Sequence, residues 1–330
     1  MPPALDGRRG YSKQKLTELR QRLASAEGIA RGKACVYVTG SFGREEASQH
    51  SDLDLFIVGG TAPDDAAKRL LSNLDEICLK AQLIHTVRDL HFPEFSGDGE
   101  YLEHYTVAQL VHSLGTPEDD ATNTFTARLL LVLESRPLVG DDVYHTAIDD
   151  VIAAYWRDYP SHQEDFLPAF LANDILRLWR TFCVNYEART QTEPDARKRK
   201  RRLKNYKLKH SRLLTCYSAL LFLMAVWREK GTVTPDDALR MVQLTPTERI
   251  EQMRAMGHAS EATPALEQVL DRYAIFLERS NADEKDLLQQ VGNDEARREM
   301  FASATDFGTA VFEAMSVIGA NSAFHRMLVV

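Results

Sequence analysis

The stretch Val38 to Val58 decides the fold of this chain and reads V-T-G-S-F-G-R-E-E-A-S-Q-H-S-D-L-D-L-F-I-V. An apolar run stops at Gly40 and Ser41, and a second apolar run opens with Asp52 and Asp54. Short apolar runs bounded by glycine are typical of buried strands. The pattern therefore predicts two strands, joined by a turn that enters a short helix.

The second predicted strand carries two carboxylates that are spaced for a metal ion. Successive side chains of a strand point to opposite faces, so Asp52 and Asp54 are expected to share one face. Two adjacent carboxylates in an apolar strand repel each other unless a cation lies between them. Magnesium prefers carboxylate oxygens. We predict that both residues hold Mg²⁺ or Mn²⁺, and the alternative is a surface turn with two incidental aspartates.

The turn between the strands is suited to an anionic ligand. Backbone N–H groups at the start of a helix have no intrahelical partner and can donate to phosphate oxygens. Glycine at position 40 allows close approach to the backbone, and Ser41 adds a hydroxyl. We predict that Gly40 and Ser41 bind the phosphates of a nucleotide. Arg44 is a further candidate for phosphate contact, although it could instead pair with Glu45 or an aspartate.

Taken together, the Gly-Ser turn and the Asp-x-Asp strand resemble the signature of the DNA polymerase β-like nucleotidyltransferase superfamily. The forms G-S-F-G-R-E-E and S-D-L-D-L, with the later T-A-R-L-L-L-V-L-E-S-R-P-L-V-G-D, resemble the bacterial PII-protein uridylyltransferase group. The likeness covers roughly residues 35–142 and does not include the HD phosphohydrolase or regulatory domains of that group. The resemblance implies metal-dependent transfer of a nucleoside monophosphate from a nucleoside triphosphate, by default ATP.

The resemblance also implies a third carboxylate on a later strand. Glu103, in Y-L-E-H-Y-T-V, is the first choice, and Asp89 and Glu100 are its rivals. In that role Glu103 would complete the metal site and accept the proton of the acceptor. The alternative is that Glu103 is only an exposed strand residue.

The fold class follows from the pattern of elements along the chain and from the resemblance. We expect an α+β protein, in which a small mixed-sheet, polymerase β-like palm domain (residues 1–145) precedes an all-helical domain (146–330). Apolar residues at helical spacing predict most of the helices. In the first domain we also predict helices over Ser12–Ala30 and Asp64–Lys80 and strands over Gln82–Val87 and Tyr101–Val107.

Two stretches of the helical domain are candidates for contacting the nucleotide, because the resemblance implies that helical basic residues reach the triphosphate. Asn173, Arg177 and Arg180 are spaced to share one helix face. The second stretch offers Lys207, Lys209 and Ser211, with Tyr206 or Tyr217 as a base-stacking candidate. The alternative for each single residue is a solvated or core position.

Charge along the chain is uneven. The net charge is −8, yet ten of the sixteen residues from 197 to 212 are Lys or Arg. A dense basic segment indicates a local polyanion contact, and the alternative is a solvated loop or helix face. This segment slightly favours RNA as the acceptor over a protein, a second nucleotide or a small molecule. A toxin or defence role fits a stand-alone transferase, although no residue indicates it.

Composition favours a cytoplasmic enzyme without a membrane partner. The four scattered cysteines are expected to be reduced core thiols, and the N-terminus lacks an apolar signal segment. The apolar stretch Leu213–Trp227 is shorter than the ~20 residues that span a bilayer, so a buried helix is predicted. A second hypothesis is a nucleotide-sensing or interaction module of the same fold with weak or no turnover. The sequence does not indicate an oligomeric state.

Overall fold

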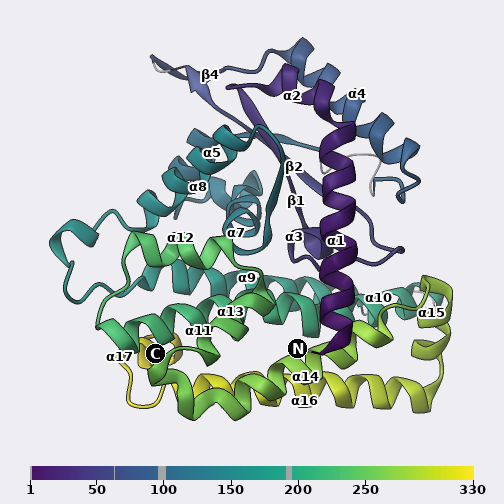
Figure 1. Cartoon of the computed structure of the whole chain (residues 1–330), viewed down its shortest axis with the longest axis vertical. Coiled ribbons are helices and arrows are strands. Elements are labelled where there is room, and N and C mark those ends of the chain that lie inside the picture. The colour runs from purple at the N-terminus through teal and green to yellow at the C-terminus, as the bar shows by residue number, and fades with distance from the viewer. Residues whose placement is uncertain (1, 63, 96–101, 191–194) are drawn as a thin grey trace. The chain divides into compact units, whose positions relative to one another are not determined.

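The computed structural model describes residues 2–62, 64–95, 102–190 and 195–330 (Figure 1). Contacts divide the chain into two compact units, residues 7–157 and residues 158–330 with the first six residues. The boundary predicted at residue 145 falls within α8 (Asp141–Tyr155), and the division by contacts follows Arg157. The predicted fold class, a small mixed sheet followed by a mostly helical region, is confirmed.

A four-stranded mixed sheet lies at the centre of the first unit. Its strands are β1 (Ala34–Thr39), β2 (Asp54–Gly59), β5 (His104–Thr106) and β6 (Arg136–Val139), in the spatial order β5-β2-β1-β6. Strand β1 is antiparallel to both of its neighbours, and β2 is parallel to β5. The central strand β1 is buried along its whole length, as its apolar sequence predicts.

Helices cover both faces of this sheet (Figure 1). On one face, apolar side chains of α1 (Pro3–Arg22), α2 (Ala24–Ala30) and α4 (Asn73–Asp89) form a core with Val36 and Ile57. The predicted helix Ser12–Ala30 is instead the second half of α1 followed by α2, with Leu23 between the two helices.

The opposite face of the sheet carries aromatic residues. Tyr37 of β1 stacks on Phe56 of β2 with ring centroids 5.6 Å apart, and Tyr144 of α8 lies 6.0 Å from Tyr37. The Tyr37 hydroxyl lies 3.5 Å from the Ala127 carbonyl of α7 (Thr124–Glu134). Strand alternation thus places one set of side chains against α1, α2 and α4 and the other against α7 and α8.

The predicted helix Asp64–Lys80 is wrong in its first part. A separate hairpin, β3 (Thr61–Ala62) and β4 (Asp65–Arg69), precedes α4. Helix α4 begins after Ser72, whose side-chain oxygen accepts the Asp75 N–H at 3.1 Å. This cap sets the start of the helix, because it satisfies a backbone donor that has no intrahelical partner.

Two further strand predictions need correction. The predicted strand Gln82–Val87 is wrong because these residues continue α4, which buries Leu79, Leu83 and Val87 at four-residue spacing. The predicted strand Tyr101–Val107 shortens to β5, and Tyr101 lies outside the described residues. Strand β6 was not predicted, since it contains Pro137; it forms an edge of the sheet, where proline is tolerated.

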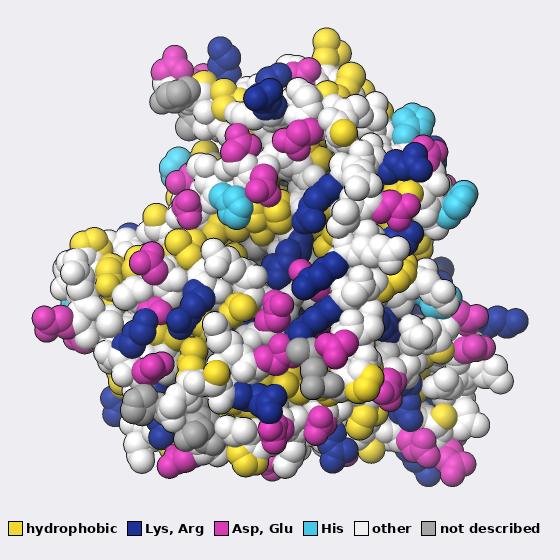
Figure 2. All heavy atoms as spheres, viewed as in Figure 1, with side chains coloured by type: hydrophobic (Ala, Val, Ile, Leu, Met, Phe, Trp, Pro, Cys, Tyr) yellow, Lys and Arg dark blue, Asp and Glu magenta, His cyan; other side chains and the backbone are white. Residues whose placement is uncertain are grey.

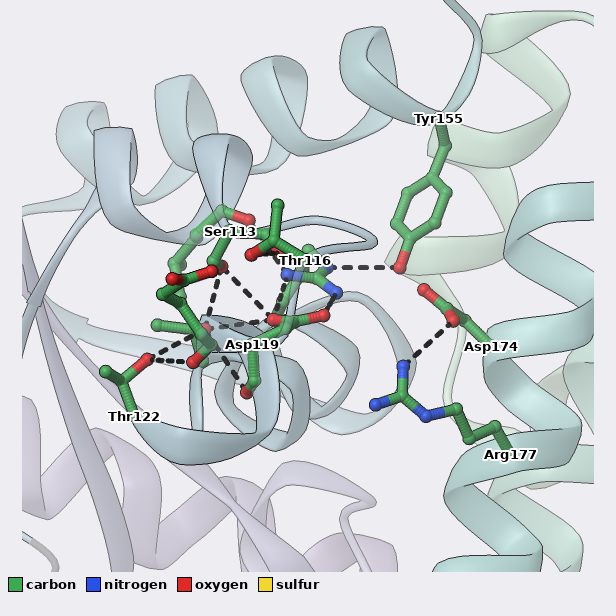
Figure 3. Close-up of polar contacts among 11 residues, drawn as sticks. Ser113, Thr116, Asp119, Thr122, Tyr155, Asp174 and Arg177 are labelled. Carbon is green, nitrogen blue, oxygen red and sulfur yellow. Dashed lines mark hydrogen bonds and ion pairs between the residues drawn. The ribbon is translucent and has the colours of Figure 1, made fainter.

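Helix α7 is anchored by a buried ion pair that Figure 3 shows in part. The fully buried Arg128 donates to Asp119 Oδ1 at 2.8 Å and to the Leu110 carbonyl at 2.9 Å. Ser113 and Thr124 also bond to the Asp119 carboxylate, at 3.1 and 2.9 Å. Burial alone would raise the pKa of Asp119, but the Arg128 guanidinium outweighs it and the pKa is lowered. This network joins α6 (Glu118–Ala121) to α7.

The second unit is mostly helical in its described residues. It begins with α9 (Ala169–Thr190), α10 (Asp195–Lys207), a π-helical turn at Leu208–Arg212 and α11 (Leu213–Lys230). After these come α12 (Pro235–Gln243), α13 (Pro246–Arg254), α14 (Thr263–Arg279), α15 (Glu284–Gly292), α16 (Asp294–Ile318) and α17 (Ala323–Val329).

The apolar stretch in this unit is a core element. By length and hydropathy alone, Arg197–Lys230 could cross a membrane, but 78% of its most apolar window is buried inside the structure. The core helices of soluble proteins pass the same test. Cys216 within this stretch is buried, as predicted, whereas Cys78 of α4 is exposed; all four cysteines are free thiols.

Candidate active site

The two sequence motifs meet where β1 ends and β2 begins. Thr39, the last residue of β1, lies opposite Asp54, the first residue of β2. Gly40 then adopts φ +66°, in the left-handed region that favours glycine. A Cβ atom at position 40 would collide with Asp54 Oδ2, so the Asp54 carboxylate lies directly against the Gly40 backbone. The structure thus brings the turn and the Asp-x-Asp motif together.

Both aspartates are exposed at this junction. Asp54 begins β2, whereas Asp52 precedes the strand, which corrects the prediction that both lie within it. The alternation nevertheless extends to Asp52, because Leu53 and Leu55 are buried and both aspartates are exposed. Among the described residues, Asp52 has no ion-pair partner within 4.0 Å.

The donor set at this junction fits magnesium. Exposed carboxylate oxygens beside a glycine turn are hard ligands that leave room for waters and phosphate oxygens. Within the part of the chain that the structure describes, no group of three or more His, Cys, Asp or Glu is gathered closely enough to hold a metal ion. Asp52 and Asp54 are the residues that would hold one as a pair, and their role as metal ligands stays a prediction.

Glu103 comes just before strand β5, which pairs with the aspartate strand β2, and its carboxylate bonds to Tyr105. The parallel pairing of Ile57 with His104 and of Val58 with Tyr105 places Glu103 beside Phe56 when extended by one residue. Glu103 therefore falls on the same face of the sheet as Asp54. Its carboxylate is exposed and accepts the Tyr105 hydroxyl at 3.0 Å. Burial, with the neighbouring Glu103 charge, raises the pKa of Tyr105.

The two rival third acids have different outcomes. Asp89 is exposed and is the last residue of helix α4, so it does not lie on a strand. Glu100 lies outside the described residues. Glu103 is therefore the best placed of the three, although its catalytic role stays a prediction.

The turn itself is a short helix, α3 (Gly40–Gly43). Ser41 is half-buried, and its carbonyl accepts the Glu46 N–H at 2.7 Å. The Gly40 N–H is already engaged, because it donates to Glu134 Oε1 at 3.1 Å. Gly40 can therefore serve a phosphate by allowing its close approach, and Ser41 offers its hydroxyl and its first-turn N–H as donors.

Arg44 lies in a buried ion-pair network behind the turn. Its Nη1 donates to Glu134 Oε2 at 2.9 Å and its Nε to Glu46 Oε2 at 2.8 Å. All three side chains are buried. Of the two roles considered from the sequence, ion pairing is the one seen, with Glu46 and Glu134 as partners. Its predicted phosphate contact stays a prediction.

Glu45 adds conformational strain beside this network. It adopts φ 58°, which is uncommon for a residue other than glycine. Its carboxylate accepts Arg136 Nε at 3.1 Å and lies 3.5 Å from Lys13 Nζ. These partners hold Glu45 in place, and strained backbone is often found at functional sites.

Comparison with known proteins finds one family match, which covers part of the first unit. Residues 16–100 match the nucleotidyltransferase domain family. No curated protein and no solved structure matches the chain significantly. The nucleotidyltransferase domain is of the polymerase β-like type, and it implies a nucleoside triphosphate as substrate. The match contains both aspartates and the turn, and ends before Glu103 and Glu134. The finer resemblance to PII uridylyltransferases stays a prediction.

The candidates outside the nucleotidyltransferase domain are placed unequally. Asn173, Arg177 and Arg180 do share one face of α9, where they line a hollow of about 450 Å³. Figure 3 shows Arg177 directed toward Asp174 of the same helix, and their charged groups lie 3.7 Å apart. This shared face was predicted from the spacing alone. Their contact with a triphosphate stays a prediction.

The second stretch of candidates mixes exposed and buried residues. Lys207 and Lys209 are exposed, and Lys209 Nζ lies 5.6 Å from the Phe301 ring centroid. Ser211 is buried at 9% exposure, which leaves it little surface for a ligand. Tyr206 is 1% exposed and packs among aromatic rings of the core, so its suggested role in base stacking is wrong.

Sequence reasoning did not connect Glu134 to the turn. The structure shows that its carboxylate contacts both Gly40 and Arg44. No local signal could have found this contact, because the residues are 94 and 90 positions apart.

Proposed function

We propose that this protein is a metal-dependent nucleotidyltransferase that transfers a nucleoside monophosphate from a nucleoside triphosphate, by default ATP, to an acceptor. The position of Asp54 carries the proposal. Its carboxylate lies against the left-handed Gly40, with the exposed Asp52 two residues before it. Paired carboxylates beside a phosphate-binding turn are the arrangement that positioning and charge stabilisation of a triphosphate require.

Each residue has a stated role in this proposal. Asp52 and Asp54 would hold Mg²⁺ or Mn²⁺, which neutralises triphosphate charge when bound. Gly40 and Ser41 receive the phosphates. A hydroxyl oxygen of the acceptor forms a bond to the α-phosphorus while the bond from the α-phosphorus to the bridging oxygen breaks, and pyrophosphate leaves. Glu103 is the proposed acceptor of the hydroxyl proton.

The acceptor that we favour is RNA, and helix α10 supports this choice. Arg197, Lys200, Lys204 and Lys207 are all exposed and are spaced three, four and three residues apart. They form one stripe along roughly 15 Å of helix, which suits successive phosphates of a strand. The stripe has a structural basis, since Leu203 and Tyr206 on α10 face the core.

The alternative is that the basic stripe of α10 is a solvated helix surface that binds no RNA. Acidic and basic side chains are interspersed over the face of the molecule shown in Figure 2, in keeping with a net charge of −8. Lys200 also lies 3.5 Å from Glu284, although both side chains are mostly exposed and such a pair is weak. The stripe therefore needs its own test.

The decisive experiment incubates the protein with α-³²P-labelled NTPs, Mg²⁺ and cell extract, and follows label in RNA, protein and small molecules. Asp52→Asn combined with Asp54→Asn is expected to abolish labelling and keep the fold. Asp149→Asn combined with Asp150→Asn is the matched control, because it removes two adjacent exposed carboxylates from α8 of the same unit. This control is expected to label normally.

The outcomes separate the proposal from its alternative. Undiminished labelling by the Asp52 and Asp54 double variant would refute the assignment of these aspartates to catalysis. NTP binding by the wild type without any labelled acceptor would favour the nucleotide-sensing module. The exposed Glu103, bonded to Tyr105, is the feature that gives this alternative weight, because the third acid is not gathered with the aspartates.

A second experiment tests the acceptor. Changing Arg197, Lys200 and Lys204 to Ser is expected to weaken binding of a fluorescent single-stranded RNA and lower its log–log salt slope by ~2, at ~0.7 for each lost contact. Changing the exposed Arg22, Arg31 and Lys68 to Ser is the charge-matched control and should bind RNA normally. Equal slopes for the two variants would remove RNA as the favoured acceptor, leaving a protein or small molecule.

A further inference from the structure

A single buried carboxylate ties the candidate phosphate turn to helix α7. Glu134, the last residue of α7, accepts the Gly40 N–H on Oε1 at 3.1 Å and Arg44 Nη1 on Oε2 at 2.9 Å. Its side chain is completely buried. Both carboxylate oxygens therefore hold opposite ends of α3, the first through the backbone and the second through the guanidinium.

The backbone of Glu134 holds the same turn from a second side. A Cβ atom at Gly43 would collide with the carbonyl oxygen and carbon of Glu134, so the turn is seated directly on the end of α7. Arg44 extends the connection, since its Nε donates to Glu46 Oε2 at 2.8 Å. The turn is thus fixed at Gly40, Gly43 and Arg44 by one residue and its ion-pair partner.

We infer that Glu134 is a positioning residue for the nucleoside triphosphate, acting through Gly40 and without touching the nucleotide. The bond to the Gly40 N–H fixes the peptide between Thr39 and Gly40, and with it the left-handed φ of +66°. That conformation sets where Ser41 points and lets Asp54 lie against the turn. Preorganised groups bind charge best when surrounding bonds lock them in place. This inference rests on the proposed function.

Only a carboxylate meets both demands on this side chain. An ionised carboxylate accepts hydrogen bonds on both oxygens, whereas an amide has one acceptor and one donor. Glu134→Gln keeps the size of the side chain but turns an NH₂ group toward either the Gly40 N–H or Arg44. It therefore loses one of the two bonds, without the cavity that Glu134→Ala would leave.

The test is a double-mutant cycle between Glu134→Gln and Ser41→Ala, read as affinity for Mg²⁺ with α,β-methylene-ATP by calorimetry. Each single change is expected to weaken binding ~10-fold, the effect of losing about one hydrogen bond to a charged group. The double variant is expected to bind nearly as well as the weaker single variant. Strong coupling of this kind shows that the two residues act on one contact. Glu118→Gln, on an exposed side chain, is the matched control.

Two further measurements keep the result independent of folding. Circular dichroism should show that Glu134→Gln is folded, while amide exchange in the peptide containing Gly40 should accelerate. Arg44→Lys is a second variant, because one ammonium cannot reproduce the planar fork that serves Glu46 and Glu134 together. It should show the same coupling to Ser41→Ala if Glu134→Gln fails to fold.

The outcomes distinguish this inference from the proposed function. Nucleotide binding by the wild type, with additive effects in the cycle, overturns the positioning role alone and leaves Glu134 a residue of the core. No binding of the analogue by the wild type overturns the proposed function and the inference with it. Coupling of Ser41 to both Glu134→Gln and Arg44→Lys supports both.

Discussion

Alanine substitution at three glycines should separate the demands of the turn from those of the fold. At Gly40 the left-handed φ of +66° costs an alanine roughly 1–2 kcal/mol. The atom that the new Cβ would meet is a carboxylate oxygen of Asp54, and that side chain can rotate away. Gly40→Ala should therefore remain folded but displace a proposed metal ligand. A shift of about 1 Å can lower the rate roughly 100-fold, so transfer should be nearly lost.

Gly43→Ala should show the opposite balance. Its Cβ would meet the carbonyl oxygens of Glu134 and Val38, which are backbone atoms and cannot rotate away. Overpacking of this kind costs roughly 1–3 kcal/mol or more. Gly28→Ala is the control, since a Cβ there meets nothing within 4 Å inside helix α2. It should gain about 0.5–1 kcal/mol.

Urea unfolding and labelled NMP transfer, measured on the same three variants, provide the assay. The expected order of stability is Gly28→Ala, then Gly40→Ala, then Gly43→Ala, and Gly40→Ala should lose more transfer than its stability loss explains. Wild-type transfer by folded Gly40→Ala would refute the placement of Asp54 against the turn. A Gly43→Ala protein as stable as Gly28→Ala would refute the seating of α3 on Glu134.

Three further predictions concern single side chains. Ser41→Ala should raise the KM for NTP about 10-fold with little change in the melting temperature, because one hydroxyl bond to phosphate is lost; an unchanged KM would exclude Ser41 from the phosphate site. Burial lowers the pKa of His210 to about 4, below its unfolded value of 6.5, so the unfolded state binds more protons between these values. The free energy of unfolding should then fall by up to about 3 kcal/mol as pH drops from 6.5 to 4. His210→Phe should flatten this slope in urea titrations, and equal slopes would contradict it. Arg128→Met should cost about 3–5 kcal/mol, since it leaves the buried Asp119 without its cation. The exposed Arg88→Met, its control, should cost less than about 0.5 kcal/mol.

The sequence by itself determined the elements that local chemistry encodes. The apolar run before Gly40 predicted β1, and the alternation around Asp54 predicted β2 and placed both aspartates on one face. Side-chain periodicity and the conformational freedom of glycine act within a few residues, so the printed order of residues is enough to indicate them. The same reasoning predicted that Arg177 and Arg180 share one face of α9.

Only the tertiary structure decided which distant residues meet. Strand β6 exists because β1 offers it a partner, and the residues that form it give a weak signal of their own around Pro137. Tyr206 has an aromatic ring that could stack on a base, but the packing of its helix buries that ring in the core.

The partner of the turn shows this division most clearly. The sequence identified Gly40, Ser41 and Arg44 as one motif, and nothing near them indicated Glu134. Its carboxylate reaches Gly40 because β1 and α7 pack together, across 94 positions of chain. Local pattern fixes which face of an element is apolar, whereas the partner of a buried charge depends on how those faces are assembled, so the residue that holds the turn could be found only in the folded chain.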